Sequence, residues 1–330
     1  MLGAAAVALM AGSASAGDLA CLITKNNTNP FFVKMKEGAE AAATAAGLDF
    51  QAYAGEKDGD AAPQITAIEN CVAAGAKGIL ITPSNDSVGP ALKDARAAGI
   101  LVIALDTPLA DTEAQDITFA TDNFEAGLLI GKWAAATMGE GAATAKIAML
   151  DINKDNISVD VARDTGFLVG FGIEVPDLTV MGSETDARVI GHEQSDANQE
   201  GGQKAMETLL AKDPDINLVY TINEPAAEGA YQALKNAGKE GQAIIVSVDG
   251  GCPGVASVKS GVIGATSQQY PLLMASKGIE AIVAFAKDGT KPVATEGLSF
   301  FNTGVNLVTD KPAEGVPSID TTKGTELCWG

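Results

Sequence analysis

The chain has 330 residues, 46% of them hydrophobic, and its 42 acidic and 22 basic residues give a formal net charge of −20. This charge argues against binding to nucleic acids and to anionic membrane surfaces, because both are negatively charged. The single histidine, His192, disfavours histidine-based catalysis and histidine-rich metal sites. The length suggests two domains.

Residues 1–16 read MLGAAAVALMAGSASA, an apolar stretch that ends in Ala14-Ser15-Ala16. This ending is typical of a secretory signal peptide, although the basic residues expected at its start are missing. The alternative is a disordered Ala-rich tail. We predict a signal peptide at 1–16 and an exported mature chain that begins near Gly17.

From residue 19 to residue 105, short apolar runs alternate with Ala-rich segments of helical periodicity. The predicted strands are Leu19–Ile23, Leu48–Tyr53, Gly78–Ile81 and Leu101–Leu105, and the predicted helices are Val33–Ala46, Ala61–Ala74 and Val88–Ala98. Strands that alternate with helices indicate a parallel sheet with helices on both faces.

The alternation begins again after Asp122-Asn123. Here the predicted helices are Glu125–Thr137, Val161–Phe171, Gln199–Leu210, Ala226–Ala237, Pro253–Ser260 and Pro271–Lys287, and the predicted strands are Lys146–Leu150, Val189–Glu193, Asn217–Thr221, Ala243–Val248 and Ile263–Ser267. We therefore predict an α/β fold with two similar doubly wound parallel-sheet lobes. The N-terminal lobe is expected at 17–121 plus 270–300 and the C-terminal lobe at 122–269 plus 301–330. Hinge segments are expected near Asp122-Asn123 and Gln268-Gln269.

The four cysteines fit an oxidising compartment. In a sheet of strand order 2-1-3, the helix that carries Cys71 crosses over the first strand, which carries Cys21, so these two residues can meet. Cys252 and Cys328 would then form a second pair. The alternative is four buried free thiols.

No catalytic set is visible in the sequence. The segment 127–133 superficially resembles a phosphate loop, but it lacks one spacer residue and has Trp133 at the magnesium-binding position. The segment that begins at Asp151 resembles a calcium loop, but it has Asn156 where Gly is needed and Ala162 where Glu is needed. We therefore predict a protein that is not an enzyme and has no cofactor and no metal site.

Polar residues stand where four predicted strands end: Thr82, Asp106, Asn223 and Asp249. Each one alone can be explained as a helix N-cap. In open α/β sheets, however, ligands bind at the carboxyl ends of the strands, so polar groups at four such ends favour a convergent site.

The stretch 21–32, CLITKNNTNPFF, places Asn29, Phe31 and Phe32 just after the first predicted strand. The two phenylalanines offer ring faces to a ligand or, equally, form the first core turn of a helix. Arg163 is expected near the start of a helix of the C-terminal lobe, either facing the cleft or exposed. Acid, amide and guanidinium groups beside aromatic rings suit a monosaccharide, which has both hydroxyl groups and an apolar face.

In this order and spacing, a series of short motifs resembles the ribose-type sugar-binding proteins of ATP-binding-cassette importers. The motifs are 29–33 (NPFFV), 81–83 (ITP), Asp106, 120–123 (ATDN), 163–167 (RDTGF), 223–225 (NEP), 249–250 (DG) and 269–271 (QYP). The resemblance implies the type I periplasmic binding protein fold, a periplasmic location and a monomer. It also implies a set of ligand-binding residues, namely Asn29, Phe31, Phe32, Asp106, Asp122, Arg163, Asn223, Asp249 and Gln269.

The chain departs from the ribose-type pattern at Thr82, Thr107 and the polar run 196–198. These departures argue against ribose itself, and several stretches are most similar to fructose-binding members. The resemblance therefore implies capture of a monosaccharide, with fructose as first choice, and delivery to a membrane permease. The alternatives are a binding protein coupled to a chemoreceptor or sensor, an enzyme on the same fold, and a sugar-responsive repressor.

Overall fold

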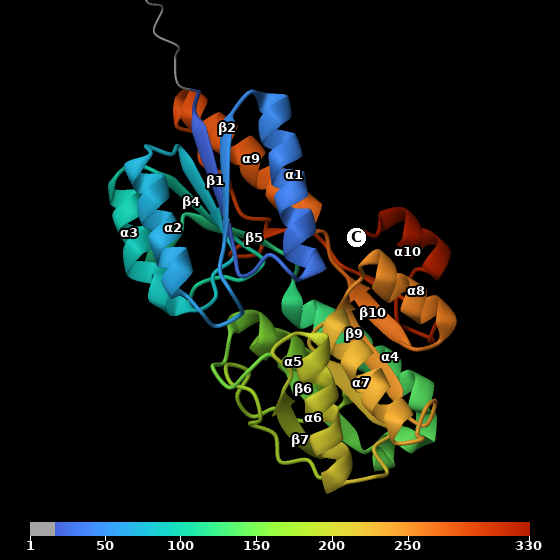
Figure 1. Cartoon of the computed structure of the whole chain (residues 1–330). Coiled ribbons are helices and arrows are strands. Elements are labelled where there is room, and N and C mark those ends of the chain that lie inside the picture. The colour runs from blue at the N-terminus through green and yellow to red at the C-terminus, as the bar shows by residue number, and fades with distance from the viewer. Residues whose placement is uncertain (1–16) are drawn as a thin grey trace, which may run out of the picture.

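The structure is a computed structural model that describes residues 17–330; the predicted signal peptide at 1–16 lies outside the described residues. Two six-stranded sheets, each covered by helices, form two lobes that lie one above the other in Figure 1. This confirms the predicted architecture of two doubly wound α/β lobes. Among residues 17–330, no helix combines the length and the apolar character needed to cross a membrane.

The N-terminal lobe has a sheet of parallel strands in the order β11-β5-β4-β3-β1-β2. Its strands are β1 (Leu19–Thr24), β2 (Asp49–Ala54), β3 (Gly78–Ile81), β4 (Leu101–Leu105), β5 (Ile117–Ala120) and β11 (Phe301–Asn302). Its helices are α1 (Pro30–Ala46), α2 (Ala62–Ala73), α3 (Gly89–Ala97) and α9 (Pro271–Asp288), with short 3₁₀ turns at Asp86–Val88 and Thr112–Ala114. One core lies under α1 and α9, and a second lies under α2 and α3.

The C-terminal lobe repeats this plan in the order β12-β10-β9-β8-β6-β7, and only β12 is antiparallel to its neighbour. Its strands are β6 (Ile147–Asp151), β7 (Val189–Gln194), β8 (Leu218–Thr221), β9 (Ile244–Asp249), β10 (Ala265–Gln268) and β12 (Asn306–Val308). Its helices are α4 (Asn123–Met138), α5 (Ser158–Phe171), α6 (Gln199–Lys212), α7 (Glu224–Asn236), α8 (Cys252–Ser260) and α10 (Thr321–Leu327), with a 3₁₀ turn at Gly139–Thr144.

The chain passes between the two sheets three times: between β5 and α4, between β10 and α9, and between β11 and β12. In the third passage, β11 pairs with β5, so the first sheet extends to Asn302, two residues beyond the expected boundary at 300. The sequence analysis does not anticipate β5, β11, β12 or α10. Except for α10, these are strands of four residues or fewer, too short to show a clear hydrophobic period.

Helices α4 and α5 approach each other closely because glycines form their interface. A Cβ atom added to Gly127 would lie 2.1 Å from the backbone oxygen of Arg163, and one added to Gly166 would lie 2.2 Å from that of Phe124. The glycines that superficially resemble a phosphate loop therefore serve helix packing. This contact fixes the position of α5, the helix that carries Arg163.

Both predicted disulfides are present. Cys21 of β1 is bonded to Cys71 of α2, and Cys252 of α8 is bonded to Cys328, just after α10. The first bond follows from the strand order β2-β1-β3, which brings α2 across β1. The second bond fastens the C-terminal tail to the C-terminal lobe.

We predict that the double variant Cys21→Ala/Cys71→Ala is less stable by about 4 kcal/mol. The bond joins residues 50 positions apart, and a closed loop of that length restricts the unfolded chain by roughly this amount. The urea-unfolding midpoint measures the change. Thiol titration of the unfolded wild-type protein serves as the control and should find no free thiol. An unchanged midpoint would show that the bond does not constrain the chain.

Candidate functional site

Three charged side chains from both lobes meet where the carboxyl ends of the two sheets face each other. Asp106 follows β4 of the N-terminal lobe, Asp249 ends β9 of the C-terminal lobe, and Arg163 lies on α5. Each side chain is only 5–6% exposed. Both aspartates have positive φ angles, 63° for Asp106 and 134° for Asp249. Such backbone strain at non-glycine residues concentrates at functional sites.

The Arg163 guanidinium links the two lobes. Its Nε donates to Asn123 Oδ1 at 2.7 Å, and its Nη1 donates to the backbone oxygen of Ile222 at 3.1 Å. Its Nη2 lies 3.5 Å from Asp106 Oδ1, and its Nη1 lies 3.9 Å from Asp249 Oδ1. The charge of Arg163 is thus held between one carboxylate of each lobe.

Gln269 joins this group at the passage between β10 and α9. Its Nε2 donates to Asp249 Oδ1 at 2.7 Å. Burial raises the pKa of Asp249 to about 7; Arg163 and the Gln269 hydrogen bond oppose this rise, and nearby Asp106 adds to it. Four of the residues expected to bind ligand, Asp106, Arg163, Asp249 and Gln269, therefore form one buried polar chain.

Glu224 supports the loop that follows Asp249. Its carboxylate accepts hydrogen bonds from the backbone N–H groups of Gly250 (2.8 Å) and Gly251 (3.0 Å) and from the Thr266 hydroxyl (2.8 Å). Burial and the charge of Asp249 raise the pKa of Glu224 although these donors lower it. Sequence reasoning noted Glu224 beside Asn223 but gave it no role.

Three of the expected ligand-binding residues are helix N-caps. Asn29 accepts from the Phe31 N–H, Asp122 from the Glu125 N–H, and Asn223 from the Ala226 N–H. Asn223 also donates its Nδ2 to the backbone oxygen of Ala197. Asn223 is therefore a helix N-cap, as the alternative explanation for this residue stated. Asn29 nevertheless lines a cavity of about 260 Å³ together with Asp249.

Phe31 and Phe32 lie in the first turn of α1, which begins at Pro30 rather than at Val33 as expected. They are 3% and 5% exposed and belong to the core of the N-terminal lobe. The two rings meet edge to face, with centroids 5.4 Å apart. Core packing therefore accounts for most of their surface.

Trp329 is a cleft residue that sequence reasoning missed. Its ring centroid lies 5.4 Å from that of Phe31, its Nε1 donates to the Gln269 backbone oxygen at 2.7 Å, and it lines the same 260 Å³ cavity as Asn29 and Asp249. Figure 1 marks the C-terminus beside α1 and α10, where the tail reaches back to the N-terminal lobe. The neighbouring Cys328, fastened to Cys252, was the available signal.

A second buried ion pair, also missed, lies on the N-terminal side of the interface. Lys25 follows β1, is 2% exposed, and its Nζ lies 3.5 Å from Asp58 Oδ1. Burial raises the pKa of Asp58, Lys25 opposes this, and Asp106 and Asp196 add to it. Asp58 and Asp196 line a cavity of about 460 Å³ that extends from one lobe to the other.

Another cavity, of about 550 Å³, adjoins this group on a different side. It is lined by Thr107 and Pro108 of the N-terminal lobe and by Ile157 and Ser158 of the C-terminal lobe. The Ser158 hydroxyl donates to the Pro108 backbone oxygen at 2.9 Å, a further contact between the lobes. No residue of the polar chain lines this cavity, whereas Asp249 lines the 260 Å³ cavity, so we place the candidate site at the polar chain instead.

Comparison with known proteins places the chain among binding proteins. The sequence profile of the family described as "Periplasmic binding protein domain" matches residues 20–291. The ribose import binding protein RbsB of Escherichia coli (strain K12) is 30% identical over 274 residues, which cover 83% of this chain and 86% of that protein. The D-allose-binding periplasmic protein of the same organism is 26% identical over 290 residues, 85% of this chain and 88% of that protein.

Solved structures share the fold. An ABC transporter solute binding protein from Agrobacterium vitis, with bound D-fucose, matches with a TM-score of 0.77 and 24% identity, covering 94% of this chain and 100% of that chain. This likeness shows that the arrangement of two lobes is common to both proteins.

We predict that Glu224→Ala lowers the free energy of unfolding by roughly 2–4 kcal/mol, because it leaves three buried donors without an acceptor. Urea denaturation at pH 7 measures this loss. Glu228→Ala is the matched control, since Glu228 lies one turn further along α7 and is only half-buried. Equal losses in the two variants would contradict the role assigned to Glu224.

Proposed function

Because the chain belongs to the periplasmic binding protein domain family, we propose that it captures a monosaccharide between its lobes and delivers it to the permease of an ATP-binding-cassette importer. Its fold is the type I periplasmic binding protein fold. The observation that carries the proposal is the buried chain Asp106–Arg163–Asp249, which joins the two lobes at the ends of their strands.

In this proposal, sugar hydroxyls replace the contacts that the charged groups make with one another. The carboxylates of Asp106 and Asp249 accept hydrogen bonds from hydroxyl groups, and Arg163 donates to hydroxyl oxygens. Trp329 and Phe31 offer apolar surface to the carbon-bound hydrogens of the ring. Ligand contacts to both lobes stabilise the closed form, so binding shifts the population towards it.

We put fructose first among the sugars. The support is the similarity of several stretches to fructose-binding members and the departures from the ribose pattern at Thr82 and Thr107. Thr82 lies at the carboxyl end of β3, where its hydroxyl accepts from the Lys25 N–H at 3.1 Å, and the Thr107 hydroxyl donates to Asp106 Oδ2 at 2.8 Å. Thr107 therefore contacts the polar chain directly, through Asp106, and Thr82 contacts the backbone of Lys25.

The same proposal includes a periplasmic location, a monomeric state and no catalytic turnover. The relatives named above are a ribose import binding protein and a D-allose-binding periplasmic protein, which supports transport rather than chemistry. Coupling of the closed form to a chemoreceptor is the alternative use of the same binding event.

The proposal predicts that fructose raises the unfolding temperature of the mature protein more than ribose, glucose, galactose, mannose, xylose, arabinose or inositol. A ligand that binds only the native state adds about 2.7 kcal/mol at a hundred times its dissociation constant. Differential scanning fluorimetry measures the shift. A larger shift with another sugar would replace fructose, and no shift with any sugar would refute the monosaccharide proposal.

The same measurement tests the site. Asp249→Ala is expected to weaken binding by roughly 2–4 kcal/mol, because hydrogen bonds to a charged acceptor are stronger than neutral ones. Asp177→Ala is the control, since Asp177 is an exposed residue of the same lobe. Unchanged affinity in Asp249→Ala would place the pocket elsewhere.

We also predict that sugar affinity falls below pH 7. The pKa of Asp249 is about 7 in the folded protein, whereas its ordinary value is 3.8. The folded protein therefore holds this proton more tightly than the unfolded chain does. The stability that the bound proton provides is present at low pH and is lost as the pH rises through 7. Sugar hydroxyl groups donate to the ionised carboxylate of Asp249, so sugar binding releases the proton from this group. The sugar affinity should therefore drop by up to about tenfold for each pH unit below 7.

Isothermal titration calorimetry between pH 5 and pH 8 measures this dependence. In Asp249→Asn the residue at 249 no longer titrates, so its affinity should be lower but nearly constant over this range. An equal slope in the variant and in the wild-type protein would assign the pH dependence to another group.

A further inference from the structure

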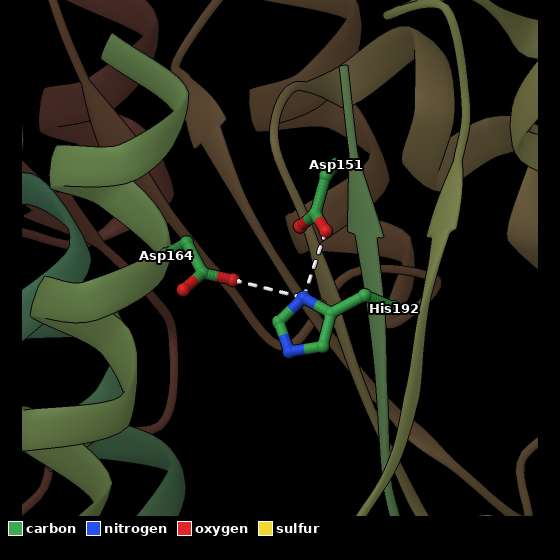
Figure 2. A group of neighbouring side chains, drawn as sticks. All are labelled: Asp151, Asp164 and His192. Atoms are coloured by element: carbon green, nitrogen blue, oxygen red, sulfur yellow. Dashed lines mark hydrogen bonds and ion pairs between the residues drawn. The ribbon is translucent and has the colours of Figure 1, made fainter. Parts of the chain in front are cut away.

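A second group of buried acids lies in the C-terminal lobe, behind the helix that carries Arg163. Asp151 ends β6, His192 is on the neighbouring strand β7, and Asp160 and Asp164 lie one turn apart on α5. Glu184 comes from the connection between α5 and β7. Figure 2 shows Asp151 and Asp164 pointing from a strand and a helix towards the same ring nitrogen of His192.

The geometry of this cluster resembles that of metal ligands. His192 Nδ1 lies 2.8 Å from Asp151 Oδ2 and 3.4 Å from Asp164 Oδ2. The three ligating atoms all lie within 4.8 Å of one another. Ligands placed tetrahedrally around zinc at the usual bond lengths are about 3.3 Å apart, so small shifts bring these atoms to such positions.

Several oxygens of these buried carboxyl groups have no hydrogen-bond partner in the described part of the chain. Within residues 17–330, neither oxygen of Asp164 accepts a hydrogen bond, although its side chain is fully buried. Three further buried oxygens of this range also accept none: Asp160 Oδ1, Asp151 Oδ1 and Glu184 Oε2. In this part of the chain no lysine or arginine forms an ion pair with the four acids. Three of these carboxyl groups, those of Asp151, Asp164 and Glu184, thus face one imidazole, and buried charges of this kind are normally paired or coordinate a metal.

Glu184 contacts the other ring nitrogen of His192. Its Oε1 lies 2.9 Å from His192 Nε2. A carboxylate that accepts the Nε2 proton holds the imidazole in the tautomer whose Nδ1 is free to coordinate, an arrangement common behind metal-binding histidines. A cavity of about 200 Å³ lined by Asp151, Asn153 and His192 gives access from outside.

From these observations we propose that Asp151, Asp164 and His192 bind one divalent transition-metal cation of the zinc class, with Glu184 orienting the histidine. One nitrogen and two carboxylate ligands suit zinc, whereas calcium and magnesium prefer oxygen ligands alone. On binding, the cation takes the place of the proton between His192 Nδ1 and Asp151, and that proton leaves to solvent. This site is separate from the proposed sugar cleft and does not depend on it.

The competing account is a metal-free network in which protonated His192 is itself the cation. Burial lowers the pKa of His192, but hydrogen bonds with Asp151 and Glu184 outweigh this and raise it to about 11. In that account the histidine stays protonated and zinc finds no free nitrogen. The two accounts therefore differ in whether the protein binds zinc in a fixed ratio.

The test is equilibrium binding of ZnCl₂ to the mature chain, with any affinity tag removed and bound metal first stripped by EDTA. We expect one zinc per chain by elemental analysis after gel filtration, together with a higher unfolding temperature. CaCl₂ and MgCl₂ at the same concentration should give neither effect. Absence of stoichiometric zinc in the wild-type protein would overturn the proposal, and a preference for calcium would overturn the assigned class of cation.

The variants His192→Gln and Asp164→Asn should each lose at least about a hundredfold in zinc affinity, and Glu184→Gln about ten- to a hundredfold. Asp155→Asn is the matched control, because Asp155 is an exposed acid of the loop that follows β6, and its affinity should not change. Circular dichroism identifies any variant that fails to fold. The visible spectrum of the Co²⁺ complex then tests the nitrogen ligand in the folded wild-type protein, and a spectrum typical of oxygen ligands alone would exclude His192.

Discussion

The buried charge of Arg163 is the constraint on which the arrangement of the two lobes depends. A guanidinium in a site of this kind is costly unless opposite charges and hydrogen-bond acceptors surround it. Asp106 supplies an acceptor from the N-terminal lobe, and Asp249, Asn123 and the Ile222 backbone supply the others from the C-terminal side. The C-terminal lobe alone leaves this charge incompletely compensated, so Arg163 favours the state in which the lobes approach.

Helix α5 connects this constraint to the interior of the C-terminal lobe. Glycines at 127 and 166 let α4 and α5 approach until backbone meets backbone, which holds Arg163 at a fixed depth. The next residue, Asp164, lies about 100° further around the helix and reaches His192. A single turn of α5 thus carries a guanidinium towards the interface and a carboxyl group towards His192.

Sequence reasoning was most successful where the determinants are local or follow from topology. Hydrophobic periodicity predicted the long helices and central strands, and the strand order predicted the Cys21–Cys71 bond. Polar residues at strand ends predicted that Asp106 and Asp249 contribute to one site. For Arg163 the residues alone left an exposed position open, and only the family resemblance assigned it to the ligand-binding set. Sequence reasoning could not find Trp329 or the Lys25–Asp58 pair, because these contacts join residues 33 to 298 positions apart without a periodic signal between them. The contacts of His192 with Asp151 and Asp164 were missed for the same reason.

The C-terminal tail that carries Trp329 is fastened by a disulfide bond. The indole of Trp329 follows Cys328, whose covalent attachment to α8 is an oxidation product. Under reducing conditions both disulfides are absent, so no covalent bond fastens the tail that carries Trp329 to the C-terminal lobe. Attachment of the tail that carries Trp329 therefore depends on the oxidation of two thiols as well as on folding.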